Sequence, residues 1–113
     1  MTKRPTFPGF SRCLKMMRHN NPGVNEDGFG WLASRAAEYL PQLIAAFWDE
    51  DNAGIRPWLM ELIGLAKSPA ALPFLLERLN DENESIRWWA VRGLRYLDTK
   101  EARTALWRAD LDT

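Results

Sequence analysis

The sequence has almost none of the residues that build disulfides and most metal centres. Cys13 is its only cysteine and His19 its only histidine among 113 residues. A lone cysteine cannot form an internal disulfide, which predicts a protein of the reducing cytoplasm. No apolar run approaches the roughly 20 residues that cross a bilayer. The basic N-terminus is not followed by the apolar stretch of a secretory signal, so we expect no contact with membranes.

Motifs of catalysis and of cofactor binding are also missing. The sequence contains no HExxH, CxxC or GxSxG motif and no glycine-rich phosphate loop. Cys13 and His19 stand six residues apart, too far to share a helical face cleanly, and no third group accompanies them. Residues 25–28 lack the spaced oxygen ligands of a calcium loop. We therefore expect a protein that is not an enzyme and that holds no metal or cofactor.

A net positive charge, which proteins that bind nucleic acids normally carry, is lacking as well. The chain has 15 basic and 15 acidic residues. Residues 1–25 carry +5, residues 26–84 carry −7, residues 85–108 carry +4 and the last five carry −2. This distribution predicts a dipolar molecule for which nucleic acid is an unlikely partner. The basic N-terminal segment either binds an anionic partner or is a tail facing the acidic middle, and we favour the tail.

What the sequence does have is an internal repeat. The pattern of residues 40–63 reappears in residues 72–94, with an offset of 32 up to Asp81 and of 31 from Ile86 onward. A period of this length is typical of stacked helical repeats. In the second copy, leucines at three- and four-residue spacing predict a first helix, residues 80–85 predict a polar turn, and a second helix follows over 86–97.

The second helix of each copy has a predicted buried side and a predicted outer side. On a helical wheel the buried side carries Ile86, Ala90, Gly93, Leu94 and Leu97 in the second copy, and Ile55, Leu59, Leu62, Ile63 and Ala66 in the first. The outer side carries Trp88, Val91, Arg92 and Arg95 in the second copy, and Pro57, Met60, Glu61 and Gly64 in the first. The two copies agree in register, which supports the assignment.

The ends of the chain follow less regular patterns. Residues 8–19 predict a short helix, and residues 20–30 predict a polar loop containing glycines. Residues 30–39 are helical in pattern and either form a separate helix or continue through Pro41 as one kinked helix to Trp48. Residues 101–109 look like the first helix of a third unit. We expect one domain over 1–113, with an N-terminal capping helix and loop at 1–30, repeats at 31–98 and a C-terminal capping helix at 99–113.

These features resemble HEAT repeats, specifically the short HEAT-like repeats common in bacterial proteins. The resemblance covers roughly residues 40–109 and rests on Leu-Pro-x-Leu-Leu-x-x-Leu-x-Asp followed by Ile-Arg-x-x-Ala-x-x-x-Leu. It implies an all-α fold, a short α-solenoid of about two full repeats with capping helices at both ends. In that family an aspartate and an arginine form a hydrogen-bonded ladder between units. Asp49 with Arg56, and Asp81 with Arg87, match this pattern.

The six tryptophans are a heavy load for a chain of this length. Trp58 and Trp89 occupy equivalent positions and are expected to pack between neighbouring units. Trp31 and Trp107 are expected in the core or in a cap. Trp88 differs, because it lies on the outer side of its helix beside basic residues. It is either a binding hot spot or a side chain that stacks under an arginine or covers the neighbouring unit.

Two acidic turns would lie side by side if the repeats stack. They form an anionic ridge that steers a basic partner, or they simply suit the N-terminus of the next helix. HEAT-like repeats usually present their second helices on the concave side. The predicted partner-binding residues are therefore Met60, Glu61, Trp88, Arg92 and Arg95 on the second helices, and Asp49, Glu50, Asp51, Glu82 and Glu84 in the turns.

The resemblance implies a non-enzymatic protein–protein binding module that is a monomer when unbound. Among bacterial chains of this size, an immunity protein that covers the active site of a cognate toxin fits best. One alternative is a protein that binds nucleic acid along a basic stripe of Arg92, Arg95, Arg103 and Arg108, against which Glu61 speaks. Another is an accessory subunit, as in chromophore attachment, but chains of that kind are usually much longer.

Overall fold

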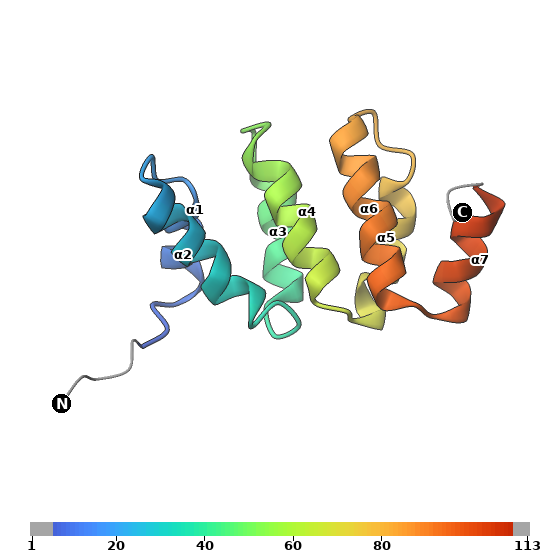
Figure 1. Ribbon diagram of the computed structural model, residues 1–113, viewed down its shortest axis with the longest axis horizontal. Coiled ribbons are helices and arrows are strands. Elements are labelled where there is room, and N and C mark those ends of the chain that lie inside the picture. The colour runs from blue at the N-terminus through green and yellow to red at the C-terminus, as the bar shows by residue number, and fades with distance from the viewer. Residues whose placement is uncertain (1–5, 110–113) are drawn as a thin grey trace.

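The structure is a computed structural model that describes residues 6–109. Its helices are α1 (Phe10–Met17), α2 (Pro22–Ala33), α3 (Leu40–Asp49), α4 (Ile55–Leu65), the 3-10 helix η1 (Pro69–Ala71), α5 (Leu72–Arg78), α6 (Glu84–Leu97) and α7 (Lys100–Arg108). Helices α2, α4 and α6 form one layer, α1, α3 and α5 lie behind them, and α7 stands at the C-terminal end (Figure 1). This arrangement confirms the predicted all-α solenoid. Among residues 6–109, no helix is long and apolar enough to cross a membrane.

The turns within the three hairpins lie at one edge of the molecule, which we call the turn edge. The α1–α2, α3–α4 and α5–α6 turns form its upper side in Figure 1, and the links between hairpins lie below. Asn52 and Asn83, which are equivalent in the two copies, start α4 and α6 at this edge. Their Oδ1 atoms accept hydrogen bonds from the N–H groups of Gly54 at 2.7 Å and Ser85 at 2.8 Å. Each asparagine thus satisfies an amide that has no partner in its helix.

The predicted polar loop over residues 20–30 is wrong, because α2 occupies residues 22–33. The Asn21 side chain accepts hydrogen bonds from the N–H groups of Gly23 and Val24, and Pro22 stands at the first helical position, which suits a proline. The N-terminal segment is therefore a helical hairpin. The favoured interpretation of a basic tail is also wrong for residues 10–18, which form α1 and its C-cap. Lys3 and Arg4 lie outside the described residues.

Neither alternative for residues 30–48 describes the structure. Helix α2 ends at Ala33, and residues 34–39 form turns before α3 begins at Leu40. Pro41 stands in the first turn of α3, where the missing amide hydrogen has no helical acceptor to lose. Helices α3 and α4 make the first full repeat, α5 and α6 make the second, and α7 follows as a single helix. Residues 110–113 of the predicted C-terminal cap lie outside the described residues.

The two full repeats meet where α4 crosses α6. A Cβ atom added to Gly64 would lie 3.0 Å from the Cα atom of Gly93, so the backbones approach closely here. Met60, one turn before Gly64, is wholly buried. The predicted position of Met60 and Gly64 on the outer side is wrong, because α6 covers that side of α4.

The tryptophans divide into packed and exposed ones. Trp58 of α4 stacks on Phe29 of α2, with ring centroids 4.9 Å apart and planes 11° from parallel, which confirms its place between units. Trp31 is half-buried against the core. Trp107 is 75% exposed, so a place in the core is wrong for it. Helix α7 is anchored by the buried side chains of Ala102 and Leu106 instead.

Replacing Gly28 with alanine is expected to destabilise the fold. Gly28 of α2 is buried, and an added Cβ would lie 2.6 Å from the carbonyl oxygen of Cys13 and 2.7 Å from the Cβ of Met16. Helices α1 and α2 would have to move apart. We expect the free energy of unfolding to fall by about 1–3 kcal/mol, as measured by urea denaturation followed by circular dichroism.

Gly30→Ala in the same helix is the matched control. A Cβ there has nothing within 4 Å, and alanine favours a helix over glycine by about 1 kcal/mol. This variant should be at least as stable as the wild type. Equal losses of stability in both variants would show that the close contact of α1 with α2 does not set the cost at residue 28.

Candidate functional site

Trp88 and Arg92 form a fixed pair on the surface of α6. Trp88 is 52% exposed, as the helical wheel predicts. The Arg92 Cζ atom lies 4.8 Å from the centre of the Trp88 ring. The Trp89 ring contacts the Trp88 ring edge-on, with the two ring centroids 4.7 Å apart. Arg92 also donates a hydrogen bond from Nη2 to the Tyr96 hydroxyl at 3.1 Å. The side chain of Trp88 is therefore held in place although half of its surface meets solvent.

The pair adjoins a side of α6 that no second helix covers. Residues of α6 stand 31 positions after their equivalents in α4, so that Trp88, Val91 and Arg95 correspond to Pro57, Met60 and Gly64. In α4 this side is covered by α6. On α6 no second helix of a further repeat lies beside it among residues 6–109 (Figure 1). Val91 is accordingly only half-buried and Arg95 is exposed. We call Trp88, Val91 and Arg95 the uncovered side of α6.

Glu61 brings a negative charge to the neighbourhood of Arg92. It occupies in α4 the position that Arg92 occupies in α6. Burial raises the pKa of the Glu61 carboxyl above its ordinary value, and the positive charge of Arg92 only partly opposes this effect. Farther along, Arg103 donates to the Asp98 carboxylate at 3.0 Å. Acidic groups thus interrupt the basic stripe that a phosphate backbone would need.

The two acidic turns occupy neighbouring positions on the turn edge, as the sequence predicts (Figure 1). Four of the predicted partner-binding acids are exposed there, namely Asp49, Asp51, Glu82 and Glu84. None of these four forms an ion pair with another residue of the 6–109 range. Their charges therefore face solvent and can act on an approaching partner.

Glu50 differs from the other turn acids, because its charge is already matched. Its Oε1 atom accepts hydrogen bonds from Arg18 Nη2 at 2.6 Å and from Arg18 Nε at 2.9 Å. Burial alone would raise the pKa of Glu50. The hydrogen bonds from Arg18 and from the Asn52 N–H outweigh burial and hold the pKa below its ordinary value. This ion pair joins the α1–α2 turn to the α3–α4 turn, so Glu50 serves the stacking of the hairpins.

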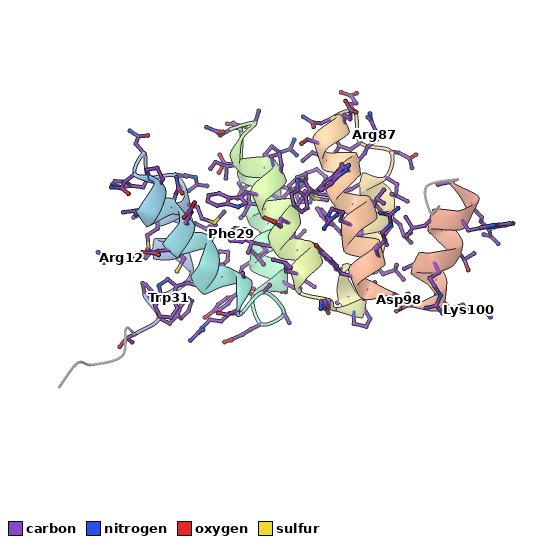
Figure 2. All side chains as sticks on the ribbon, in the orientation of Figure 1. Arg12, Phe29, Trp31, Arg87, Asp98 and Lys100 are labelled. Atoms are coloured by element: carbon purple, nitrogen blue, oxygen red, sulfur yellow. The ribbon has the colours of Figure 1, made fainter. Side chains whose placement is uncertain are left out.

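The arginines of the predicted ladder bind backbone carbonyls. Arg87 Nη1 donates to the Asp81 carbonyl oxygen at 2.7 Å, and Arg56 Nε donates to the Phe47 carbonyl oxygen at 3.4 Å. Arg87 lies at the turn edge (Figure 2). Arg56 thereby bonds a carbonyl group in the last turn of α3, and Arg87 bonds one in the turn that follows α5.

The aspartates of the predicted ladder have other surroundings. The Asp81 carboxylate accepts a hydrogen bond from Arg78 Nη1 at 3.2 Å, within the same repeat. Asp49 is exposed and makes no ion pair within residues 6–109. The prediction of a ladder between neighbouring units is therefore wrong. The two arginines are structural, but their partners lie in the same hairpin, in α3 for Arg56 and in the α5–α6 turn for Arg87.

A second tryptophan–arginine stack lies on the first helices. Trp48 of α3 is 54% exposed, and Arg78 Cζ of α5 lies 4.7 Å from its ring centre. The sequence patterns do not single out Trp48, although it follows Ile44 by one helical turn on the flank of the buried side. In both stacks the arginine Nε is buried without a hydrogen-bond acceptor. The contact with the aromatic ring partly compensates for the missing hydrogen bond.

Cys13 and His19 lie in different environments. Cys13 is wholly buried, and burial raises the pKa of its thiol while Arg35 weakly opposes the shift. His19 is exposed, and its Nδ1 atom accepts a hydrogen bond from the Asn21 N–H at 3.0 Å. A buried, protonated thiol is a poor nucleophile. Within residues 6–109, no group of three or more His, Cys, Asp or Glu residues is arranged to hold a metal ion.

Glu50 and Glu61 are expected to change stability with pH in opposite directions. The folded-state pKa of Glu50 is lowered, so ionised Glu50 stabilises the fold above the ordinary glutamate range, and this stability is lost as the pH falls through the folded pKa. Glu50→Gln should lower the free energy of unfolding at neutral pH by up to about 1 kcal/mol. In acid, below the folded pKa, the effect should vanish. Urea unfolding curves measured across this pH range provide the test.

Glu61→Gln is the matched comparison. The folded-state pKa of Glu61 is raised, so the neutral carboxyl stabilises the fold below the ordinary glutamate range, and this stability is lost as the pH rises through the raised pKa. Glu61→Gln should therefore increase stability at neutral pH and leave it unchanged in acid. A loss of stability at neutral pH would mean that attraction to Arg92 outweighs burial.

Comparison with known proteins agrees with the architecture. A model of HEAT repeats matches residues 40–113, well over half of the chain. The match begins at the first residue of α3 and includes both full repeats and α7. Searches of curated proteins and of solved structures gave no match. Repeats of this kind generally mediate protein interactions, so the fold indicates an interaction module. Its stacked helical hairpins and the extent of the match show that the chain belongs to the HEAT repeat family.

Proposed function

We propose that this protein binds another protein through the uncovered side of α6 and acts without catalysis. The observation that carries the proposal is the state of Trp88. This side chain is 52% exposed, yet it is clamped by Trp89 and Arg92. Exposure of a large apolar ring to water is unfavourable. This cost is removed when a partner covers the ring in the complex.

The fixed geometry of Trp88 favours a binding hot spot. Tryptophan and arginine dominate the residues whose truncation most weakens protein complexes. An interface side chain that is already held in one rotamer loses little conformational entropy on binding. The hydrogen bond from Arg92 to Tyr96 and the stacking under Arg92 provide such preorganisation.

The charges around the surface support an oriented encounter. Arg95 lies on the uncovered side of α6 and Arg92 stacks on Trp88 next to it, whereas Asp49, Asp51, Glu82 and Glu84 lie on the turn edge. Two regions of opposite sign attract a partner with the complementary pattern and repel one that approaches in the reverse orientation. Glu61 beside Arg92 makes a nucleic acid a poorer partner than a protein.

The partner that suits this surface best is a toxin domain, with the chain as its cytoplasmic immunity protein. A protein that offers a binding surface and needs no cofactor changes its partner's activity by covering it. Occlusion of an active site requires only a rigid scaffold with exposed contact residues, and the stacked hairpins provide both. Regions of opposite charge at the surface would additionally speed association with a charged active-site cleft.

An immunity role predicts that a toxin domain is encoded beside this chain's gene, and the proposal is tested with Trp88→Ala against that domain; a gene neighbourhood without one would contradict the immunity role. Purified chain should inhibit the toxin and bind it, and Trp88→Ala should weaken binding by at least about 2 kcal/mol, or roughly thirtyfold in Kd. Calorimetry measures Kd, and an assay of toxin activity measures inhibition. Trp48→Ala is the matched control, because Trp48 is also about half exposed and stacks with an arginine but lies on α3, in the other layer of helices.

Several outcomes would contradict the proposal. Equal affinity of wild type and Trp88→Ala, with both folded, would place the interface elsewhere. Binding without inhibition would leave a protein-binding module and remove the immunity role. If native lysate yielded only nucleic acid bound to the chain, with affinity falling steeply with salt, the protein-binding function would be wrong.

A further inference from the structure

A basic cleft at the N-terminal end has no part in the proposed function. It encloses about 910 Å³ and is formed by α1 with the residues on either side of it, by Val24 of α2 and by Tyr39. Arg12, Lys15 and His19 supply its basic groups. Arg12 lies at the end of the molecule opposite to Lys100 of α7 (Figure 2). We call this feature the N-terminal basic cleft.

No acidic side chain among residues 6–109 neutralises the positive charge of the cleft. No acidic residue lines it, and the chain from residue 6 to residue 25 contains none. Arg12 and Lys15 are exposed and make no ion pair within residues 6–109. Arg18, on the same segment, is by contrast bound to Glu50. The folded chain thus neutralises one base of this segment and leaves two facing the cleft.

Apolar side chains lie beside these bases. Phe10 stacks on Tyr39 with ring centroids 5.3 Å apart and planes 22° from parallel. Met16 and Val24 are half-buried along the same cleft. An occupant therefore meets cations and apolar surface within one depression, which suits a ligand that alternates the two characters.

We propose that the N-terminal basic cleft binds an acidic, extended segment of a protein partner. Arg12 and Lys15 are three residues apart on α1, which places their Cβ atoms about 5–6 Å apart. Side chains on one face of an extended peptide recur about every 7 Å. Two carboxylates on that face can therefore each meet one base, and an aromatic or aliphatic side chain can rest on Phe10 and Tyr39.

His19 adds a donor at the far end of the cleft. Its Nδ1 accepts from the Asn21 N–H at 3.0 Å, which leaves Nε2 as the ring nitrogen that can contact an occupant. From Arg12 to His19 the chain rises about 10 Å. The cationic and donor groups are thus strung out along the cleft, which matches a series of single carboxylates better than one phosphate group. Their separation is the reason for choosing a peptide over a phosphate ligand.

The site is independent of the uncovered side of α6, because it belongs to the first hairpin. Loss of the α6 interface through Trp88→Ala would leave the N-terminal basic cleft unchanged. The same protein can therefore fail in one binding test and succeed in the other. A partner that bridges both ends would bind the chain at two separated places.

The test uses an acetylated peptide, Glu-Tyr-Glu-Phe-Glu, added to isotope-labelled chain and followed by NMR. Amide shifts should saturate and should be confined to the cleft, that is, to residues 9–19, Val24 and Tyr39. Arg12→Gln and Lys15→Gln should each weaken binding by about tenfold. Both residues are exposed, so the urea midpoint of these variants should match that of the wild type. Lys100→Gln, which removes an exposed base at the opposite end, should leave the affinity unchanged.

The controls separate this proposal from general electrostatic attraction. The uncharged peptide Gln-Tyr-Gln-Phe-Gln should not bind at the same concentrations. The proposal is wrong if Lys100→Gln weakens binding as much as Lys15→Gln, or if the shifts spread over α7. It is equally wrong if inorganic phosphate shifts the same amides with the affinity of the acidic peptide, or if no saturable binding occurs.

Discussion

The close crossing of α4 and α6 at Gly64 and Gly93 is the contact on which the surface properties depend. With no side chains between them, the two backbones approach until a Cβ on Gly64 would stand 3.0 Å from Gly93 Cα. This approach buries Met60 completely and brings Glu61 into the electrostatic range of Arg92. It also fixes the rotation of α6 about its own axis, so that Trp88 faces outward. A larger residue at the crossing would displace α6 and the surface that it carries.

At three of the positions where the two copies differ, the difference has a structural reason before any functional one. Pro57, Met60 and Gly64 lie on a helix side that the next repeat covers, whereas Trp88, Val91 and Arg95 lie on the equivalent side with no second helix beside it among residues 6–109. A glycine suits a close crossing, and an arginine suits solvent. Residue differences at equivalent positions of the two repeats therefore first of all identify the side of α6 that no second helix covers. The lack of a covering helix does not by itself explain Trp88. A polar residue would be exposed to solvent at a lower free-energy cost than a tryptophan ring that is 52% exposed.

The sequence was sufficient for the fold and for the exposure of Trp88, because both follow from periodicity within one helix or one repeat. It was insufficient wherever the answer depended on a neighbouring element. A helical wheel for α4 shows one buried side, but a helix inside a stack has a second flank that only the next repeat covers, and Met60 lies there. Asn21 and Pro22 fall in the predicted polar loop over residues 20–30, although the same residues are a good start for a helix. Arg87 was paired with the wrong atom of Asp81, since sequence spacing does not distinguish a carboxylate from a carbonyl oxygen.

The distribution of ion pairs explains how a chain with no net charge keeps charged surfaces. Arg18 and Glu50 neutralise each other where two hairpins meet, and Arg78 and Asp81 do so within a repeat. These pairs lie where burial of an unmatched charge would be costly. Several of the remaining charges are grouped by sign, with four exposed acids on the turn edge and with bases at the N-terminal basic cleft and on α6. Folding stability alone does not require this separation, because exposed pairs contribute little. The separation of charges instead affects association with a partner, because separated regions of opposite sign orient a charged partner before contact.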